Sequence, residues 1–247
     1  MASLAWRAEL ACFNAWPALG QVHFEGWAAR YGGGFTRRIN SASPLVPRAA
    51  RLARVLPEIE AAYRLWGLPP RVRVLSLLDP AVDAVLDAQG YVVEGETATL
   101  HAPIAGPAKP DPHQVEFSGL SPDWLQAKHA LSGFTPGQAR TYDEVVRRIS
   151  IPTVYAAVRH DGEIAAVAYG AVHDRMLCVE GVVTAERLRG QGIGRRMVQA
   201  LIAWGAARSA DHACLQVERA NTAALALYRG LGFRRELYGY RYRRKGG

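Results

Sequence analysis

Three glycines alternate with other residues in the stretch RLRGQGIGRR, which runs from Arg187 to Arg196. Glycines at this density let the backbone adopt positive φ and approach a ligand closely. The arginines around them favour an anion, because a guanidinium pairs well with phosphate oxygens. The stretch therefore predicts a loop that holds a phosphate-bearing ligand.

The neighbouring elements favour the same class of ligand. RMLCVEGVVT, residues 175–184, has the composition of a strand that leads directly into the loop. Apolar residues recur at helical spacing after the loop: Met197, Val198, Leu201 and Ile202. A strand, a glycine loop and a helix in succession direct free backbone N–H groups and a helix N-terminus at an anion.

Two common nucleotide-binding motifs do not fit the loop. A GxGxxG motif requires a third glycine where this chain has Arg195 or Met197. A GxxxxGK[ST] motif requires a lysine and a hydroxyl residue after Gly194, and neither is present. Both motifs are therefore excluded.

RGQGIG, residues 189–194, resembles the coenzyme A pyrophosphate signature (Q/R)xxGx(G/A) of the GCN5-related N-acetyltransferases (GNAT). About thirty residues later, LQVERANTAALALYRGLGF resembles the second conserved segment of that family. The resemblance covers residues 115–245. It implies an N-acetyltransferase that uses acetyl-CoA as cosubstrate and transfers the acetyl group to a small-molecule or peptide amine, by direct attack in a ternary complex.

The resemblance also implies roles for individual residues. Val182 and Val183 are expected to bind coenzyme A through strand amides, and Asn221 to contact its pantetheine arm. The loop residues expected to bind the pyrophosphate are Arg189, Gly190, Gln191, Gly192, Ile193, Gly194 and Arg195. Some of these residues also have a purely structural interpretation. Asn221 would serve as a helix N-cap, the two valines would pack in the core, and the arginines would lie on a solvated surface.

Tyr228 is expected to protonate the departing thiolate, unless it is only a buried core residue. Glu180 is the candidate general base, because it lies two residues before Val182 on the expected strand. Glu218 and an ordered water are alternatives. Some relatives carry a glutamate on the following strand, where this chain has Gln216.

The N-terminal half resembles a degenerate copy of the same fold. Residues 61–101 follow the order of residues 199–243, with Trp66 aligned to Trp204 and Tyr91 to Phe233. Where the second copy has RGQGIG, residues 40–50 read NSASPLVPRAA, and proline has no N–H to donate.

We therefore predict an α/β protein with a tandem GNAT fold, each half a mixed, mostly antiparallel sheet flanked by helices. The expected units are a degenerate domain at 1–102 without the coenzyme A signature, a Pro-rich linker at 103–112 and a catalytic domain at 113–247.

Local signals predict several elements of the second half. Ser121 and Pro122 are typical of a helix start, and Asp161-Gly162 between two apolar runs predicts a hairpin turn. Near the C-terminus, YGYRYRRKGG has two interpretations. Its alternating tyrosines suit the buried face of a last strand, whereas the aromatic and basic composition would also suit a nucleic-acid surface.

Composition limits the function further. The net charge of +8 comes from 27 arginines and three lysines, which favours an anionic ligand. Cys12, Cys178 and Cys214 have no paired spacing and the histidines form no HxxH motif, so we expect buried thiols and no metal. No apolar run suits a signal or a membrane span, which predicts a cytoplasmic protein. An acyl-CoA-binding sensor and a nucleic-acid-binding module remain alternatives, and the oligomeric state is undefined.

Overall fold

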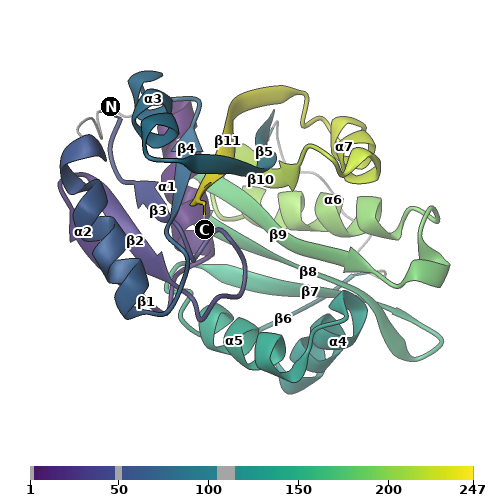
Figure 1. The fold of residues 1–247 in the computed structure, drawn as a ribbon. Coiled ribbons are helices and arrows are strands. Elements are labelled where there is room, and N and C mark those ends of the chain that lie inside the picture. The colour runs from purple at the N-terminus through teal and green to yellow at the C-terminus, as the bar shows by residue number, and fades with distance from the viewer. Residues whose placement is uncertain (1–2, 48–51, 105–114, 247) are drawn as a thin grey trace.

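A computed structural model describes residues 3–47, 52–104 and 115–246 of the chain (Figure 1). The described residues form seven α-helices, one short 3₁₀-helix and eleven strands. The elements of the first half are α1 (Leu4–Ala15), β1 (Gly20–Phe24), β2 (Trp27–Tyr31), β3 (Ala42–Pro44), α2 (Leu52–Leu65), β4 (Arg71–Leu75), α3 (Ala81–Ala88) and β5 (Tyr91–Pro103). Those of the second half are β6 (Glu116–Ser118), α4 (Pro122–Ser132), α5 (Pro136–Val146), β7 (Thr153–His160), β8 (Glu163–His173), β9 (Met176–Thr184), η1 (Glu186–Leu188), α6 (Ile193–Ala206), β10 (His212–Glu218), α7 (Thr222–Arg229) and β11 (Arg235–Lys245).

All eleven strands join one sheet, in the order β1-β2-β3-β4-β11-β5-β10-β9-β8-β7-β6. Most neighbouring pairs are antiparallel, and two are parallel: β3 with β4, and β9 with β10. The predicted α/β class and the mostly antiparallel sheet are therefore confirmed. The two halves share a single continuous sheet, which the sequence did not indicate.

The last strand of each half lies between strands of the other half. β11 pairs with β4 on one side and with β5 on the other. In turn, β5 lies between β11 and β10, pairing with β10 from Thr97–Glu218 to Pro103–His212. Separating the halves would therefore break backbone ladders along both strands.

The two halves follow the same order of elements. β3, α2, β4, α3 and β5 in the first half correspond to β9, α6, β10, α7 and β11 in the second. In each half the first strand of this series pairs in parallel with the second, β3 with β4 and β9 with β10. The predicted linker at 103–112 falls almost entirely outside the described residues, so the domain boundary stays a prediction.

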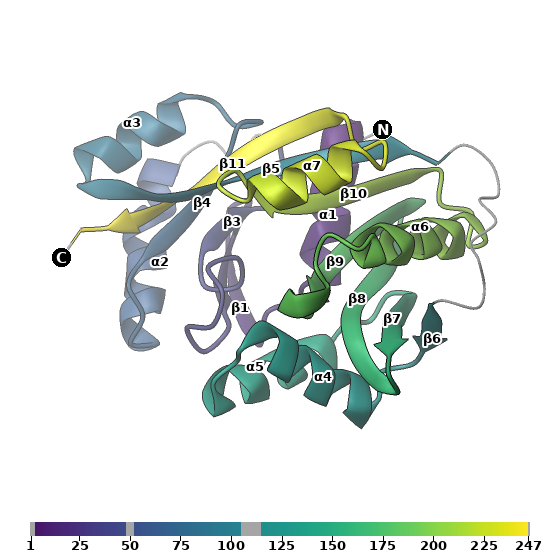
Figure 2. The same cartoon turned by 90° about the vertical axis from the view of Figure 1, so that its right-hand side faces the viewer.

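Helices cover both faces of the second half of the sheet (Figure 2). On one face α6 packs against β7, β8 and β9, and on the other α4 packs against β8 and β9. α1, from the first half, also contacts β8 to β11. Within the described residues no helix combines the length and hydropathy needed to cross a bilayer.

Several local predictions are confirmed. The Ser121 hydroxyl accepts from the Trp124 amide at 3.2 Å and Pro122 is the first residue of α4. β7 and β8 form a hairpin around Asp161-Gly162, where both residues have positive φ. The alternating tyrosines of β11 are buried, as expected for a last strand: Tyr238, Tyr240 and Tyr242.

A histidine pair lies where β5 meets β10. His101 Nε2 and His212 Nδ1 are 3.0 Å apart, and His101 is buried. Burial, with smaller effects of the His212 and Arg235 charges, lowers the pKa of His101 to about 4. The unfolded chain therefore binds a proton at His101 between pH 6.5 and pH 4 that the folded chain does not.

We expect the free energy of unfolding to fall as pH drops through this window, by at most about 1.4 kcal/mol per pH unit from this residue. Urea titrations at several pH values measure it. His101→Gln should flatten the dependence, while the matched change at exposed His23 should not. An unchanged slope in His101→Gln would contradict the assignment.

Candidate active site

β9 and β10 separate soon after they begin to pair. Their parallel register covers Met176–Cys178 on β9 and His212–Cys214 on β10, although both strands continue for several residues beyond. Past this point no strand of the described residues pairs with the edge of β9 that faces β10. Its backbone groups are therefore available to a ligand that enters between the strands.

A β-bulge interrupts β9 in the separated region. Val167 pairs with Val183 and Tyr169 with Glu180, so Gly181 and Val182 together face Ala168. Gly181 has φ +65°, and a Cβ there would lie 3.5 Å from the Tyr142 hydroxyl oxygen. The positive φ favours glycine here, whereas a Cβ at this distance would make only an ordinary van der Waals contact.

The glycine loop ends where α6 begins, as predicted. Gly192 is the residue before α6 and has φ +77°, a left-handed conformation that favours glycine. The amides of the first turn of α6, starting at Ile193, have no acceptor within the helix. These N–H groups and the positive end of the helix dipole are suited to an anion at the open end of the β9–β10 gap.

The arginines of this loop differ in their contacts. Arg189 is exposed and lies 3.4 Å from the Glu186 carboxylate. Arg195 donates to the Gly230 carbonyl at 3.0 Å, which links α6 to the end of α7. Both side chains are exposed to solvent at the anion site, so each can also bind a phosphate.

α7 carries two further predicted residues. Asn221 is the N-cap of α7, and its side-chain oxygen accepts from the Ala224 amide at 3.1 Å. Tyr228 is 8% exposed, and burial, with an added effect of the Glu180 charge, raises its pKa to about 12. The hydroxyl therefore stays protonated at neutral pH and can act as a hydrogen-bond donor.

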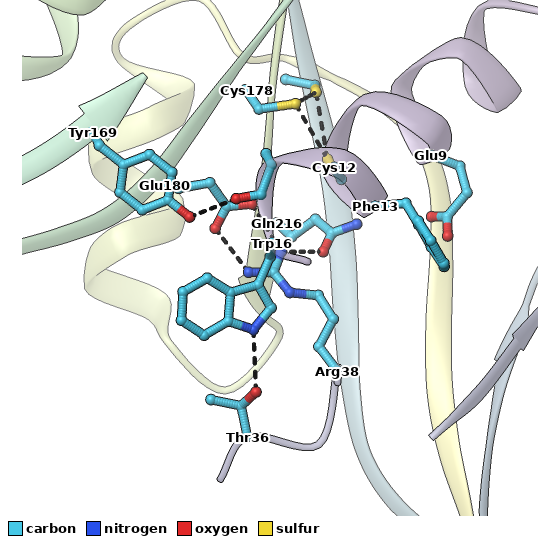
Figure 3. A network of polar contacts seen from close by, with 12 residues as sticks. Glu9, Cys12, Phe13, Trp16, Thr36, Arg38, Tyr169, Cys178, Glu180 and Gln216 are labelled. Atoms are coloured by element: carbon cyan, nitrogen blue, oxygen red, sulfur yellow. Dashed lines mark hydrogen bonds and ion pairs between the residues drawn. The ribbon is translucent and has the colours of Figure 1, made fainter. Parts of the chain in front are cut away.

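Glu180 forms a bidentate ion pair with an arginine from the other half (Figure 3). Arg38 Nη1 and Nη2 donate to the two carboxylate oxygens at 2.8 and 2.9 Å. The same Nη1 donates to Gln216 Oε1 at 2.8 Å. Since Glu180 is on β9 and Gln216 on β10, the Arg38 guanidinium bridges the two strands just beyond their last pair.

A buried polar network continues from Gln216 into the first half. Gln216 Nε2 donates to the Tyr238 hydroxyl at 3.3 Å, and that hydroxyl donates to Glu9 at 2.6 Å. Glu9 in turn pairs with buried Arg73 on β4. The Gln216 amide therefore connects the β9–β10 gap to the first half.

The segment that carries Arg38 packs over the α4–α5 face. The Phe35 and Phe134 rings are 5.1 Å apart and nearly perpendicular. Trp16 lies 5.4 Å from the Tyr142 ring and donates to Thr36 at 3.2 Å. The first half therefore supplies part of the wall next to the β9 bulge.

Cys178 and Cys214 form the last β9–β10 pair, and Cys12 from α1 contacts both. Cys12, Cys178 and Cys214 are free and buried, as predicted, with sulfur atoms 3.5–3.7 Å apart. Their separation in sequence did not indicate this contact. Contacts with the other two thiols, together with burial, raise the pKa of Cys178 well above its ordinary value, and the three cysteines pack in an apolar cluster.

The alternative base Glu218 lies at the far end of β10, where it pairs with Arg37 and is largely exposed. The charge of Glu180, and not that of Glu218, contributes to the raised pKa of Tyr228. Sequence reasoning missed Arg38, Lys128 and Tyr142. Arg38 is one of 27 arginines, and nothing local distinguishes it.

The family described as "Probable histone acetyltransferase Rv0428c C-terminal" matches residues 5–243 of the chain. The chain belongs to this family, and through it to the GNAT superfamily. "Uncharacterized N-acetyltransferase YobR" of Bacillus subtilis is 25% identical over 226 residues, which cover 89% of this chain and 90% of that protein.

Solved structures have the same fold. A GCN5-related N-acetyltransferase from Kribbella flavida has a TM-score of 0.74 at 18% identity, and the match covers 100% of this chain and 97% of that one. A tandem GNAT protein from the clavulanic acid biosynthesis pathway has a TM-score of 0.65 at 12% identity, covering 84% and 76%. The predicted superfamily and fold class are therefore confirmed.

We expect the buried Arg38–Glu180 pair to contribute to the stability of the fold. Arg38→Met leaves the buried Glu180 carboxylate without its donors, so the free energy of unfolding should fall by about 3 kcal/mol. Adding Glu180→Gln should recover part of the loss, because the uncompensated charge is removed. Urea denaturation followed by tryptophan fluorescence measures both variants.

Arg54→Met serves as the matched control, because its pair with Glu25 is exposed. We expect a change there of no more than about 1 kcal/mol. Equal effects of Arg38→Met and Arg54→Met would show that the buried pair does not support the fold.

Proposed function

We propose that this chain is an acetyl-CoA-dependent N-acetyltransferase and that its second half carries out the reaction. The observation that carries the proposal is the gap between β9 and β10, which opens toward a glycine loop and the N-terminus of α6. An elongated ligand with a pyrophosphate at one end and a thioester at the other fits this combination of groups.

In this proposal the amides of residues 189–194 bind the pyrophosphate, and Arg189 and Arg195 add positive charge. Unpaired backbone groups near Val182 and Val183 bind the pantetheine arm, and Asn221 contacts it from the start of α7. We further propose one coenzyme per chain. In the first half, Pro44 and Pro47 lie in the corresponding region and have no N–H to donate.

When bound, acetyl-CoA supplies an activated acetyl group on sulfur. The Val182 amide is suited to stabilise the oxyanion that develops on the thioester carbonyl. Tyr228 is suited to donate a hydrogen bond to the departing thiolate. With a tyrosine pKa near 12 and a thiol near 8.5, a strong hydrogen bond is favoured over early proton transfer.

We propose an amine acceptor, a small molecule or a peptide N-terminus, that approaches from the α4–α5 face and attacks directly. A second candidate, an acyl-CoA-binding sensor without turnover, is favoured by one observation. Both oxygens of Glu180, the expected base, already accept from Arg38. Release of coenzyme A thiol with a panel of polyamines, aminoglycosides and short peptides distinguishes the two: binding without release would favour the sensor.

Gly192→Val tests the anion site. A β-branched residue disfavours φ near +77° and would disturb the amides of the loop, so acetyl-CoA should bind at least about tenfold more weakly, or about 1.4 kcal/mol. Calorimetric titration measures the change. Gly162→Val is the matched control, because Gly162 has φ +83° in the β7–β8 turn. Equal affinities in both folded variants would contradict the assignment of the loop.

Tyr228→Phe tests the leaving-group contact. The variant keeps the ring that packs near Phe233 and loses only the hydroxyl. We expect turnover to fall by about 10²-fold, with little change in acetyl-CoA affinity. Steady-state kinetics measures the rate, and Tyr91→Phe, a buried tyrosine on β5, is the control. Undiminished turnover in Tyr228→Phe would remove this residue from the mechanism.

A further inference from the structure

A buried lysine contacts the bulge of β9. Lys128, on α4, is 6% exposed, and its Nζ donates to the Gly181 carbonyl at 2.9 Å. An ammonium has three donors, and Gly181 is its one protein acceptor among the residues that the structure describes. The group therefore has unused hydrogen-bonding capacity beside Val182, the residue proposed to contact the thioester.

The Tyr142 hydroxyl lies close to Lys128 and is a buried polar group without a hydrogen-bond partner among the described residues. Tyr142 belongs to α5 and is 3% exposed. The ammonium nitrogen of Lys128 is 5.7 Å from the Tyr142 ring centre and 5.8 Å from that of Phe134. A buried hydroxyl left unpaired costs about 1 to 3 kcal/mol, which a bound polar ligand would offset.

Burial and the surrounding charges together set the pKa of Lys128. Glu180 approaches from β9, with Arg38 behind it, and Tyr142 faces the lysine from α5. His129 and Asp143 pair with each other at 2.7 Å across α4 and α5. Burial is the larger effect and lowers the pKa of Lys128 to about 8, against an opposing effect of Glu180.

Lys128 and Tyr228 lie on opposite faces of the sheet that contains Glu180. The charge of Glu180 affects the pKa of both residues, yet Lys128 belongs to α4 and Tyr228 to α7, which cover opposite faces of the sheet. A proton acceptor on the α4 side and a proton donor on the α7 side would flank a thioester lying between β9 and β10.

We infer that Lys128 is the general base of the acetyl transfer, and that the Tyr142 hydroxyl helps to hold the acceptor nitrogen beside it. This inference rests on the proposed function. Neutral Lys128 takes one proton from the acceptor ammonium, and the freed amine attacks the thioester carbon. The N–C bond forms as the C–S bond breaks, and the second amine proton reaches the thiolate with Tyr228 as donor. Glu180 is then a positioning residue, held by Arg38.

Substitutions at Lys128 test the inference through the rate and its pH dependence. Lys128→Met should lower kcat/KM by about 10²-fold or more for the fastest amine of the panel. It should also remove the increase of kcat/KM with pH that deprotonation of Lys128 causes in the wild type. Lys128→Arg keeps the positive charge and a donor to the Gly181 carbonyl, but a guanidinium cannot accept a proton. We therefore expect kcat/KM to fall as far as in Lys128→Met. Acetyl-CoA affinity should be unchanged in both variants.

Lys245→Met is the matched control, because this lysine pairs with Glu60 at the far end of β11. Wild-type rates in Lys128→Met, or recovery of the rate in Lys128→Arg, would overturn the inference. Failure of the proposed function looks different: the wild-type chain itself would then either not bind acetyl-CoA or bind it without releasing coenzyme A thiol with any amine.

A direct titration needs no acceptor. The chain has only three lysines, so NMR of protein labelled with [¹³C]lysine gives few signals, and Lys128→Arg identifies the one from residue 128. We expect that signal to titrate well below the ordinary lysine value of about 10.4. Titration of Lys128 at the ordinary value would overturn the inference, because the side chain would then be fully protonated at neutral pH.

Discussion

The separation of β9 from β10 is the constraint on which the site depends. Two strands that stop pairing inside a sheet leave backbone groups without partners, and buried groups of this kind require other partners. Here the gap is bridged at its closed end by Arg38 and opens at the other end toward the glycine loop and α6. The free backbone groups in between are the proposed binding surface for the pantetheine arm.

The first half contributes to this site although its own loop region contains prolines. Its last strand, β5, lies between β10 and β11, and β11 lies between β4 and β5. This exchange brings α1 and the segment before β3 against the second half. From there Arg38 reaches Glu180, and Trp16 packs on Tyr142. In the proposed function the first half therefore forms part of the wall on the side from which the acceptor approaches.

The sequence predicted features that depend on local chemistry. The N-cap at Ser121, the turn at Asp161-Gly162 and the loop before α6 each follow from residue types within a few positions. The buried face of β11 follows from simple alternation of its tyrosines. Superfamily and fold class followed from motifs in the second half.

Features that depend on contacts between distant segments could not be predicted. Strand exchange leaves no local pattern, because β5 and β11 would have the same composition in either position. Arg38 lies 142 residues from Glu180 in sequence, and Cys12 lies 202 from Cys214, so no spacing rule connects them. Lys128 is on a predicted helix, but its burial depends on α5 and β9 together. Such contacts become visible only when the sheet order is known.

A crystal structure of the chain grown with acetyl-CoA tests the central claim most directly. We expect one coenzyme per chain, with its pyrophosphate on the amides of residues 189–194 and its acetyl carbonyl next to the Val182 amide, between β9 and β10. A coenzyme bound along β3 and β4 of the first half, or one that leaves the β9–β10 gap empty, would contradict it.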